Sequence, residues 1–185
     1  MDASSRMKVA AAQLAPEFKG VDANTETVID IIFRLSQERV DLVVFPEAFL
    51  TGYCFSSREE VLEIALTENS PHLQAIAKAT TEYNVHAIVG YAERKDDNIF
   101  NSAGVFSPHT PIGKYRKTHI PFLGLDRFAE AGADLPLFDI AEAKVGIGIC
   151  YDVRIPELSR CYALSGADVI CIPTNWPQSA EYWHC

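Results

Sequence analysis

Short apolar runs alternate along the chain with segments in which apolar residues recur every three or four positions. Runs of this length predict strands, and the wider spacing predicts helices. Strands are predicted over residues 7–14, 42–45, 85–92, 98–106, 112–116, 135–140, 144–149 and 168–172. Helices are predicted over residues 24–39 and 58–66, from Pro71 and after Asp152. The close succession of strand, helix and strand near the start predicts a parallel pair with a right-handed crossover, and therefore an α/β fold.

Residue types that favour helix starts precede two of these helices. Either Asp22 or Asn24 is expected to cap the first helix. Ser70 is expected to cap the helix that opens at Pro71, because proline suits the first helical position. The polar residues 95–98 predict a turn between two antiparallel strands.

The segment 144–157 changes from a strand pattern to a helix pattern at Cys150. An apolar run with two glycines precedes this cysteine, and Asp152 and Pro156 are typical of a helix start. Cys150 is therefore predicted to lie on a strand-to-helix turn, beside the first helical N–H groups. A thiol in that position is expected to have a lowered pKa. The alternative is a buried cysteine that packs as a small hydrophobic residue, and the pattern alone favours neither.

Length and charge limit what the chain can be. Its 185 residues and apolar content of 48% suit one globular domain. We expect residues 1–6 to be a disordered arm and residues 7–185 to form that domain. The formal net charge of −9 argues against binding to nucleic acid or to an anionic membrane. No apolar run approaches the roughly 20 residues that a transmembrane helix needs, so no membrane partner is expected.

The five cysteines show neither a pairing pattern nor a CxxC motif, which predicts a reducing, cytoplasmic location. Cys161, in the helix after Asp152, and Cys171, in an apolar strand, are expected in the core. None of the five histidines forms a ligand pattern with another His, Cys or Asp. Neither a metal nor a cofactor is therefore expected.

Three reactive side chains, Glu47, Lys117 and Cys150, follow predicted strands. Taken singly, each has an ordinary explanation; the basic segment around Lys117, for example, is typical of a solvent-facing surface. Taken together, they form a chemical set. A carboxylate can accept the thiol proton, the cysteine can attack a carbonyl or nitrile carbon, and the ammonium can stabilise the oxyanion. His119, two residues after Lys117, is expected to have a structural role.

These three residues lie in the segments FPEAFLTGY, YRKTHIPF and GICYDVRIPE. In order and spacing the segments resemble the signatures of the nitrilase (carbon–nitrogen hydrolase) superfamily, and the resemblance runs from about Met7 to the C-terminus. It implies a four-layer αββα sandwich, assembled as a homo-dimer or larger homo-oligomer. The superfamily's Glu-Lys-Cys triad then corresponds to Glu47, Lys117 and Cys150.

The resemblance further implies a two-step acyl transfer from a small amide. Glu47 would act as general base, and Cys150 would form a thioester acyl-enzyme as ammonia or an amine leaves. Water would then hydrolyse the thioester. Lys117 and the backbone N–H of Tyr151 would form the oxyanion site.

The same resemblance bears on the substrate. Four residues are placed near the pocket as substrate-binding residues: Tyr53, Tyr151, Asn175 and Trp176. For Tyr53, Asn175 and Trp176, which lie in predicted loops, packing at the strand ends is an equally good explanation. Members that act on nitriles typically carry Cys-Trp-Glu, whereas the Cys-Tyr-Asp found here is similar to the amide and carbamoyl hydrolases. Of the two adjacent arginines that often hold a carbamoyl amino acid, only Arg154 is present.

Some features of the family pattern are left open by the sequence. Many members have a second acidic residue between the lysine and the cysteine, and Asp126 and Glu130 are the nearest candidates. Members usually continue beyond the equivalent of Cys185, so the domain is expected to be incomplete at its C-terminal end. Two other functions are also compatible: a catalytically silent nitrilase-like scaffold that binds a partner, and an α/β domain that uses Cys150 as a redox-sensing thiol.

Overall fold

The computed structural model describes residues 7–109 and 113–176, so the predicted N-terminal arm lies outside the described residues. The strands are β1 (Val9–Ala11), β2 (Leu42–Val44), β3 (His86–Lys95), β4 (Asn98–Phe106), β5 (Gly113–Arg116), β6 (Phe138–Ile140), β7 (Ala143–Ile147) and β8 (Val169–Cys171). The helices are α1 (Val21–Gln37), α2 (Arg58–Ile64), α3 (Pro71–Tyr83) and α4 (Pro156–Leu164), with 3₁₀ helices η1 (Gly124–Arg127) and η2 (Cys150–Arg154). Within the described residues, no helix is long and apolar enough to cross a membrane.

The strands form two sheets. The first sheet has the order β1-β2-β3-β4-β5, in which β1, β2 and β3 are parallel and β4 and β5 continue antiparallel. The second has the order β6-β7-β8, with β6 antiparallel and β8 parallel to β7. The parallel pair predicted at the start of the chain and the antiparallel hairpin predicted across residues 95–98 are therefore confirmed.

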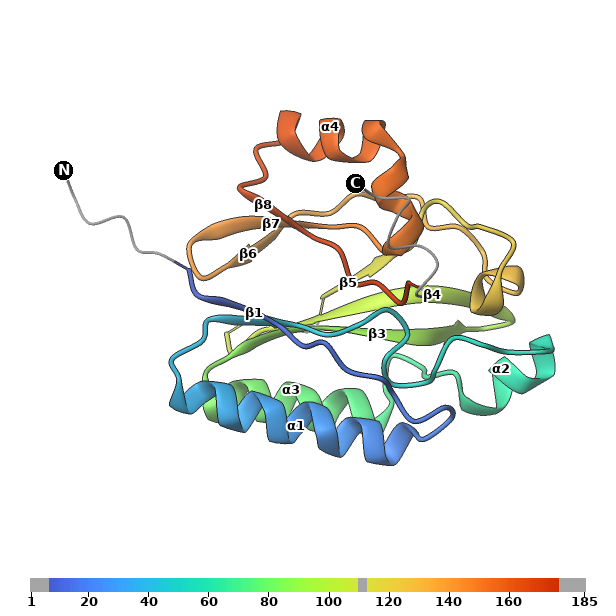
Figure 1. Ribbon diagram of the computed structural model, residues 1–185, viewed down its shortest axis with the longest axis horizontal. Helices are drawn as coiled ribbons and strands as arrows, with labels where there is room; N and C mark the ends of the chain where they lie inside the picture. The colour runs from blue at the N-terminus through green and yellow to red at the C-terminus, as the bar shows by residue number, and fades with distance from the viewer. Residues whose placement is uncertain (1–6, 110–112, 177–185) are drawn as a thin grey trace.

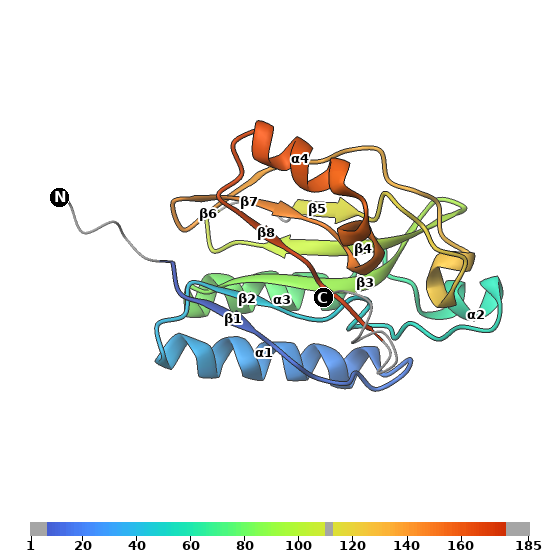
Figure 2. The ribbon, with the colours of Figure 1, turned by 45° about the horizontal axis from the view of Figure 1, so that its top comes forward.

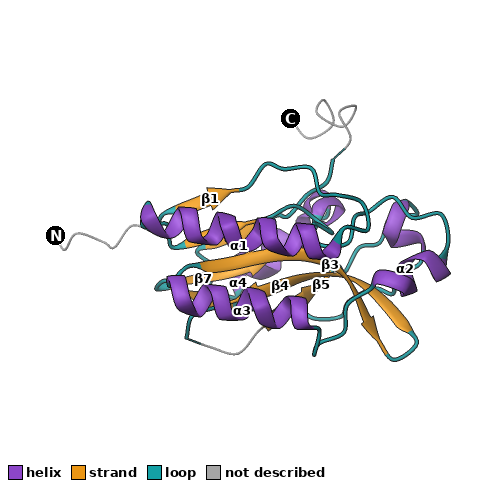
Figure 3. Cartoon of the chain, turned by 90° about the horizontal axis from the view of Figure 1, so that it is seen from below, coloured by secondary structure: helices purple, strands orange, loops and turns teal. Residues whose placement is uncertain are grey.

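The two sheets lie face to face, and helices cover both outer faces (Figures 1 and 2). Helices α1 and α3 run side by side over the five-stranded sheet (Figure 3), and α4 covers the three-stranded sheet. The predicted four-layer αββα sandwich is confirmed. In this arrangement the loops that follow β2, β5 and β7 can carry side chains from both sheets to one place.

Alternation along the central strand β3 explains how the layers pack. Val89 and Tyr91 face the cluster formed with α1 and α3, which includes Ile32 and Ile76. Ile88, the residue before Val89, faces the second sheet and joins a separate inter-sheet cluster. Because side chains alternate along a strand, a strand buried on both faces reads as a continuous apolar run, as this one does.

The structure corrects the predicted start of the first helix. Helix α1 begins at Val21, so Asp22 and Asn24 lie within it and neither caps it. Asn24 is instead buried, and its side chain bonds the backbone of Glu17 and Leu50. It therefore ties the helix to the loop that follows β2 rather than ending the helix.

The two cysteines expected in the core differ in burial. Cys171 is buried between the sheets, as predicted. Cys161 is exposed, because the buried face of α4 is formed by Leu158 and Tyr162, four residues apart, and Cys161 lies off that face. The expectation of a buried Cys161 was wrong.

Candidate active site

Glu47, Lys117 and Cys150 each follow closely after a strand, β2, β5 and β7 respectively. The segment after β8 connects two of them: the backbone N–H of Cys150 donates to Pro173 O at 2.9 Å, and that of Glu47 points to Thr174 O at 3.4 Å. The backbone N–H of Lys117 donates to the carbonyl of a β4 residue at 2.8 Å. Backbone hydrogen bonds therefore hold the three strand ends in fixed positions.

A glycine allows the Glu47 loop to approach the sheet. Gly90, in the middle of β3, lies against the backbone of residues 46–48, and a Cβ at this position would overlap it. The loop is then held by the Leu50 N–H, which donates to Gly90 O at 3.0 Å. An alanine at Gly90 would push the Glu47 backbone off the strand.

Lys117 is fully buried and contacts two carboxylates. Its Nζ lies 2.7 Å from Glu47 Oε1 and 2.6 Å from Asp126 Oδ2. Asn101 of β4 joins the same two residues, because its Nδ2 donates to Glu47 Oε1 and to Asp126 Oδ1, each at 2.8 Å. The hydroxyl of Tyr53 donates to Asp126 Oδ2 at 2.9 Å. These bonds leave Glu47 Oε2 without a hydrogen-bond partner among the described residues.

The buried charges shift the pKa values of the triad. Burial raises the pKa of Glu47, the ammonium of Lys117 opposes that shift, and the charge of Asp126 adds to it. Burial would lower the pKa of Lys117, but Glu47 and Asp126 outweigh it and raise that pKa. The site therefore favours a charged lysine and a carboxylate that accepts a proton readily.

Burial, together with the charge of Glu47, raises the pKa of the Cys150 thiol to about 12. The lowered pKa predicted from the turn was wrong, because the thiol is sequestered beside a carboxylate. Lys117 and a backbone hydrogen bond from Asn175 oppose this shift without reversing it. Cys150 is therefore a protonated thiol next to a base.

Asp152 joins the turn that carries Cys150 to the segment that carries Lys117. It is buried; its Oδ2 accepts from the Ile149 N–H at 2.8 Å and from the Tyr115 hydroxyl at 2.7 Å. Its Oδ1 accepts from the His119 N–H at 2.9 Å and lies 2.8 Å from His119 Nδ1. His119 therefore contacts a residue that holds the site together, in keeping with the structural role expected for it.

Cys150 has φ +47°, a left-handed conformation that non-glycine residues rarely adopt. It begins the 3₁₀ helix η2 directly after the strand. The predicted strand-to-helix turn at Cys150 is confirmed, and strain of this kind is typical of functional positions.

The sequence pattern of the family described as Carbon-nitrogen hydrolase matches residues 8–185. The chain belongs to the carbon–nitrogen hydrolase family. The resemblance inferred from the three segments, to the nitrilase superfamily, is confirmed.

Relatives of this chain carry nitrilase and amidase names. It is 39% identical over 173 residues to a nitrilase of Pyrococcus abyssi, a match that covers 91% of this chain and 65% of that protein. It is 31% identical over 172 residues to omega-amidase NIT2-A of Xenopus laevis, covering 86% of this chain and 61% of that protein. The crystal structure of Saccharomyces cerevisiae Nit3, a member of branch 10 of the nitrilase superfamily, has a TM-score of 0.81 at 25% identity, covering 96% of this chain and 68% of that chain. The chain spans less than two thirds of the length of the first two relatives.

Two polar residues around Lys117 were not identified from the sequence. Asp126, one of two candidates for a second acid, contacts Lys117. The other candidate, Glu130, donates its backbone N–H to Ile99 O of β4 at 2.7 Å. Asn101 was missed altogether. Its signal was available, because an amide inside an otherwise buried strand needs polar partners.

Of the four predicted substrate-binding residues, Tyr53 and Asn175 lie beside the triad, whereas Tyr151 and Trp176 make other contacts. Tyr53 lies with its ring 6.0 Å from Lys117 Nζ, and the Asn175 N–H donates toward the Cys150 thiol. The side chain of Tyr151 is partly exposed and lies against the guanidinium of Arg154. These contacts bring the first two residues to the triad and turn the Tyr151 ring toward solvent.

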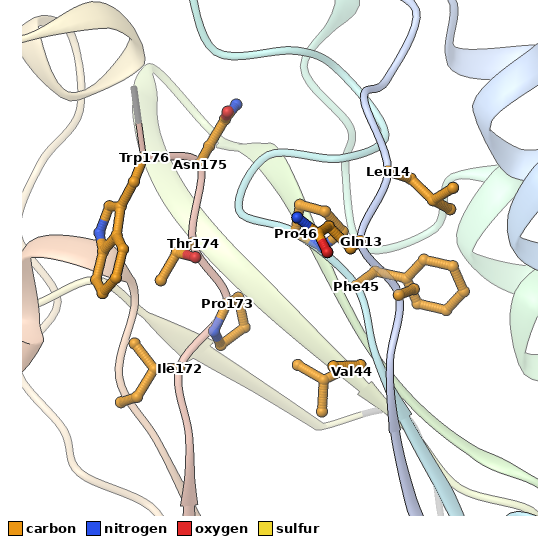
Figure 4. Close-up of a pocket in the computed structure, with 12 residues that line it drawn as sticks. Gln13, Leu14, Val44, Phe45, Pro46, Ile172, Pro173, Thr174, Asn175 and Trp176 are labelled. Carbon is orange, nitrogen blue, oxygen red and sulfur yellow. The ribbon is translucent and has the colours of Figure 1, made fainter. Parts of the chain in front are cut away.

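Trp176 lines a different cleft, of about 510 Å³. Figure 4 shows this cleft, with Gln13 and Pro46 on one wall and residues 172–176 on the other. The cleft lies between the ends of β1 and β2 and the segment after β8. Among the described residues, no group of three or more His, Cys, Asp or Glu side chains is arranged to hold a metal ion.

Proposed function

We propose that this carbon–nitrogen hydrolase cleaves the C–N bond of a small linear amide through a thioester on Cys150. The observation that carries the proposal is a buried ammonium and a buried carboxylate beside the thiol. Lys117 Nζ is 2.7 Å from Glu47 Oε1, and burial together with the charge of Glu47 raises the pKa of the Cys150 thiol. In these roles Glu47 is the base, Cys150 the nucleophile and Lys117 the group that stabilises the oxyanion.

In the first half-reaction Sγ of Cys150 attacks the amide carbonyl carbon while Glu47 accepts the thiol proton. Negative charge moves to the carbonyl oxygen, where the ammonium of Lys117 and the backbone N–H of Tyr151 stabilise it. The C–N bond breaks as Glu47 passes its proton to the nitrogen. Ammonia or an amine leaves, and the acyl group stays on sulfur.

In the second half-reaction Glu47 removes a proton from water, whose oxygen attacks the thioester carbon. The C–S bond breaks, the proton returns to sulfur and a carboxylic acid leaves. Because the pKa of the Cys150 thiol is raised to about 12, little thiolate exists before substrate binds. Proton transfer to Glu47 therefore accompanies each attack by sulfur.

Ammonia release from a panel of small linear amides tests this proposal. The folded chain is expected to release ammonia, and Cys150→Ala is expected to abolish the release. Cys161→Ala is the matched control, because that thiol is exposed on α4 and should be dispensable. Release that survives Cys150→Ala, or a folded chain inactive on every amide, would contradict the proposal and favour the silent-scaffold alternative.

A further inference from the structure

A cavity of about 650 Å³ opens beside the triad. Its walls are residues 53–55 of the loop after β2, residues 122–124 of the loop after Lys117, Arg127 and Asn175. Tyr53 and Asn175 belong both to this cavity and to the site, since one lies against Lys117 and the other bonds the Cys150 thiol. A group bound here would reach the triad past these two residues. We call this space the side cavity.

The side cavity is lined mainly by apolar surface. Phe122 is 87% exposed and Leu123 is 58% exposed, although both are large apolar residues that gain by leaving water. Phe55 and Tyr53 add further aromatic surface to the lining. An apolar group that enters the cavity would remove this apolar surface from contact with water, which is favourable.

Two polar groups on the walls, the Tyr53 hydroxyl and the Arg127 guanidinium, already make contacts of their own. The Tyr53 hydroxyl lies 2.9 Å from Asp126 Oδ2 and 3.0 Å from Leu123 O. Arg127 is the cation among the described lining residues; its Nη2 donates to Phe55 O at 2.6 Å, and its guanidinium lies over a neighbouring aromatic ring. A substrate carboxylate would therefore compete with the Phe55 carbonyl for Nη2 of this guanidinium.

We infer that the side cavity binds the acyl group of the substrate and selects uncharged, apolar acyl chains over short or carboxylate-bearing ones. The inference rests on the proposed function, because it assigns the acyl side of that reaction. Each added methylene leaves water on binding, which predicts a rise in kcat/KM of roughly two- to fourfold per methylene. A terminal carboxylate would lose water among mainly apolar walls, beside a guanidinium that already bonds the Phe55 carbonyl, which predicts a loss on the order of tenfold.

The experiment measures kcat/KM for the series from acetamide to hexanamide, and compares pentanamide with glutaramate, which has the same chain length and ends in a carboxylate. The double variant Phe122→Ala, Leu123→Ala is expected to flatten the chain-length series. Leu164→Ala is the matched control, because Leu164 is 77% exposed on α4, away from the side cavity. It should leave the series unchanged. Affinity for hexanamide and for acetamide is measured in parallel on Cys150→Ala, which cannot form the thioester.

The outcomes separate the two proposals. Hydrolysis with a flat series, or with glutaramate preferred to pentanamide, overturns the inference and leaves the amidase function standing. A second outcome is no hydrolysis, while Cys150→Ala still binds hexanamide more tightly than acetamide and loses that preference when Phe122→Ala and Leu123→Ala are added. This outcome supports the cavity assignment and refutes the function. No hydrolysis and no preference in binding overturns both.

Discussion

Lys117 shares one ammonium group between the buried carboxylates of Glu47 and Asp126. Desolvating three charges is costly, and the group is stable only while opposite charges face each other at hydrogen-bond distance. Asn101 satisfies one oxygen of each carboxylate. The lysine therefore has a structural as well as a chemical role, because it holds together two carboxylates that would otherwise repel.

Replacing Lys117 with alanine should both abolish activity and destabilise the fold. Two buried carboxylates would lose their common counter-ion, which costs about 3–5 kcal/mol in the free energy of unfolding. Lys144→Ala is the matched control, because the Lys144–Asp139 pair lies on the surface and should change that free energy by less than about 1 kcal/mol. Urea unfolding followed by circular dichroism measures both. Equal stability of the two variants would show that the Lys117 contacts do not hold the fold together.

In the proposed mechanism, the raised pKa of Glu47 sets the acid limb of activity. Glu47 can accept the thiol proton only as a carboxylate, so kcat/KM should be present above its pKa and lost below it. Burial moves that pKa up from the ordinary value of 4.5, so the midpoint should lie above pH 4.5. A profile of kcat/KM from about pH 4 to about pH 10 checks this. An acid midpoint at or below pH 4.5, or a rise near the pKa of an ordinary free thiol, would contradict the assigned roles.

At the scale of elements, Asp152 is the connection between η2 and the segment after β5. It bonds Ile149 on one side and His119 on the other. Asp152→Asn keeps the size but loses acceptor capacity, so the distance between the Cys150 and Lys117 segments should change. A displacement of about 1 Å in a catalytic group can cost on the order of 100-fold in rate, and we expect kcat to fall toward that limit.

The matched control for Asp152→Asn is Asp168→Asn. Asp168 also accepts a backbone N–H, that of Lys144 at 2.7 Å, but it lies at the start of β8 away from the triad. It should leave kcat within about twofold of the wild type. If Asp152→Asn is folded and keeps the kcat of the wild type, the connection does not position the triad.

A second ionic cluster joins three strands of the larger sheet. Glu93 of β3 accepts from Arg116 and Lys114 of β5 and from Ser102 of β4. Burial would raise the pKa of Glu93, but these donors outweigh burial and lower it from 4.5 to about 2. A lowered folded-state pKa gives stability that is fully present above the unfolded pKa and is lost as the pH falls toward 2.

Replacing Glu93 with glutamine tests this linkage. The free energy of unfolding of the wild type should fall between pH 4.5 and pH 2, and the fall should be smaller in Glu93→Gln. Unfolding by urea at several acidic pH values measures the difference. Parallel pH dependence in the two proteins would show that Glu93 does not contribute to it.

For the whole molecule, the strands and the triad could be predicted because their signals are local. An apolar run followed by Glu47 or Cys150 is visible in the sequence, and parallel strand ends gather side chains at one edge. Asp126 was not distinguished from Glu130 because the segment around them shows no strand or helix periodicity, so only tertiary contact decides which side chain reaches Lys117. The high pKa of the thiol was mispredicted for a related reason, since the degree of burial depends on distant segments.

The remaining expectations concern the whole protein. The chain spans 65% and 64% of the length of two of its relatives, and family membership says nothing of how copies assemble. A homo-dimer or larger homo-oligomer and a cytoplasmic location therefore stay predictions. So do the linear-amide substrate and the absence of a cofactor.

Intact-mass spectrometry after brief incubation with amide substrates tests the central claim most directly. The account predicts a mass increase equal to the acyl group of each turned-over amide, located on the peptide that contains Cys150 and absent in Cys150→Ala. Ammonia should appear together with the adduct. Ammonia release with no adduct at any time, even after rapid acid quenching, or an adduct that survives in Cys150→Ala, would contradict a thioester mechanism at this cysteine.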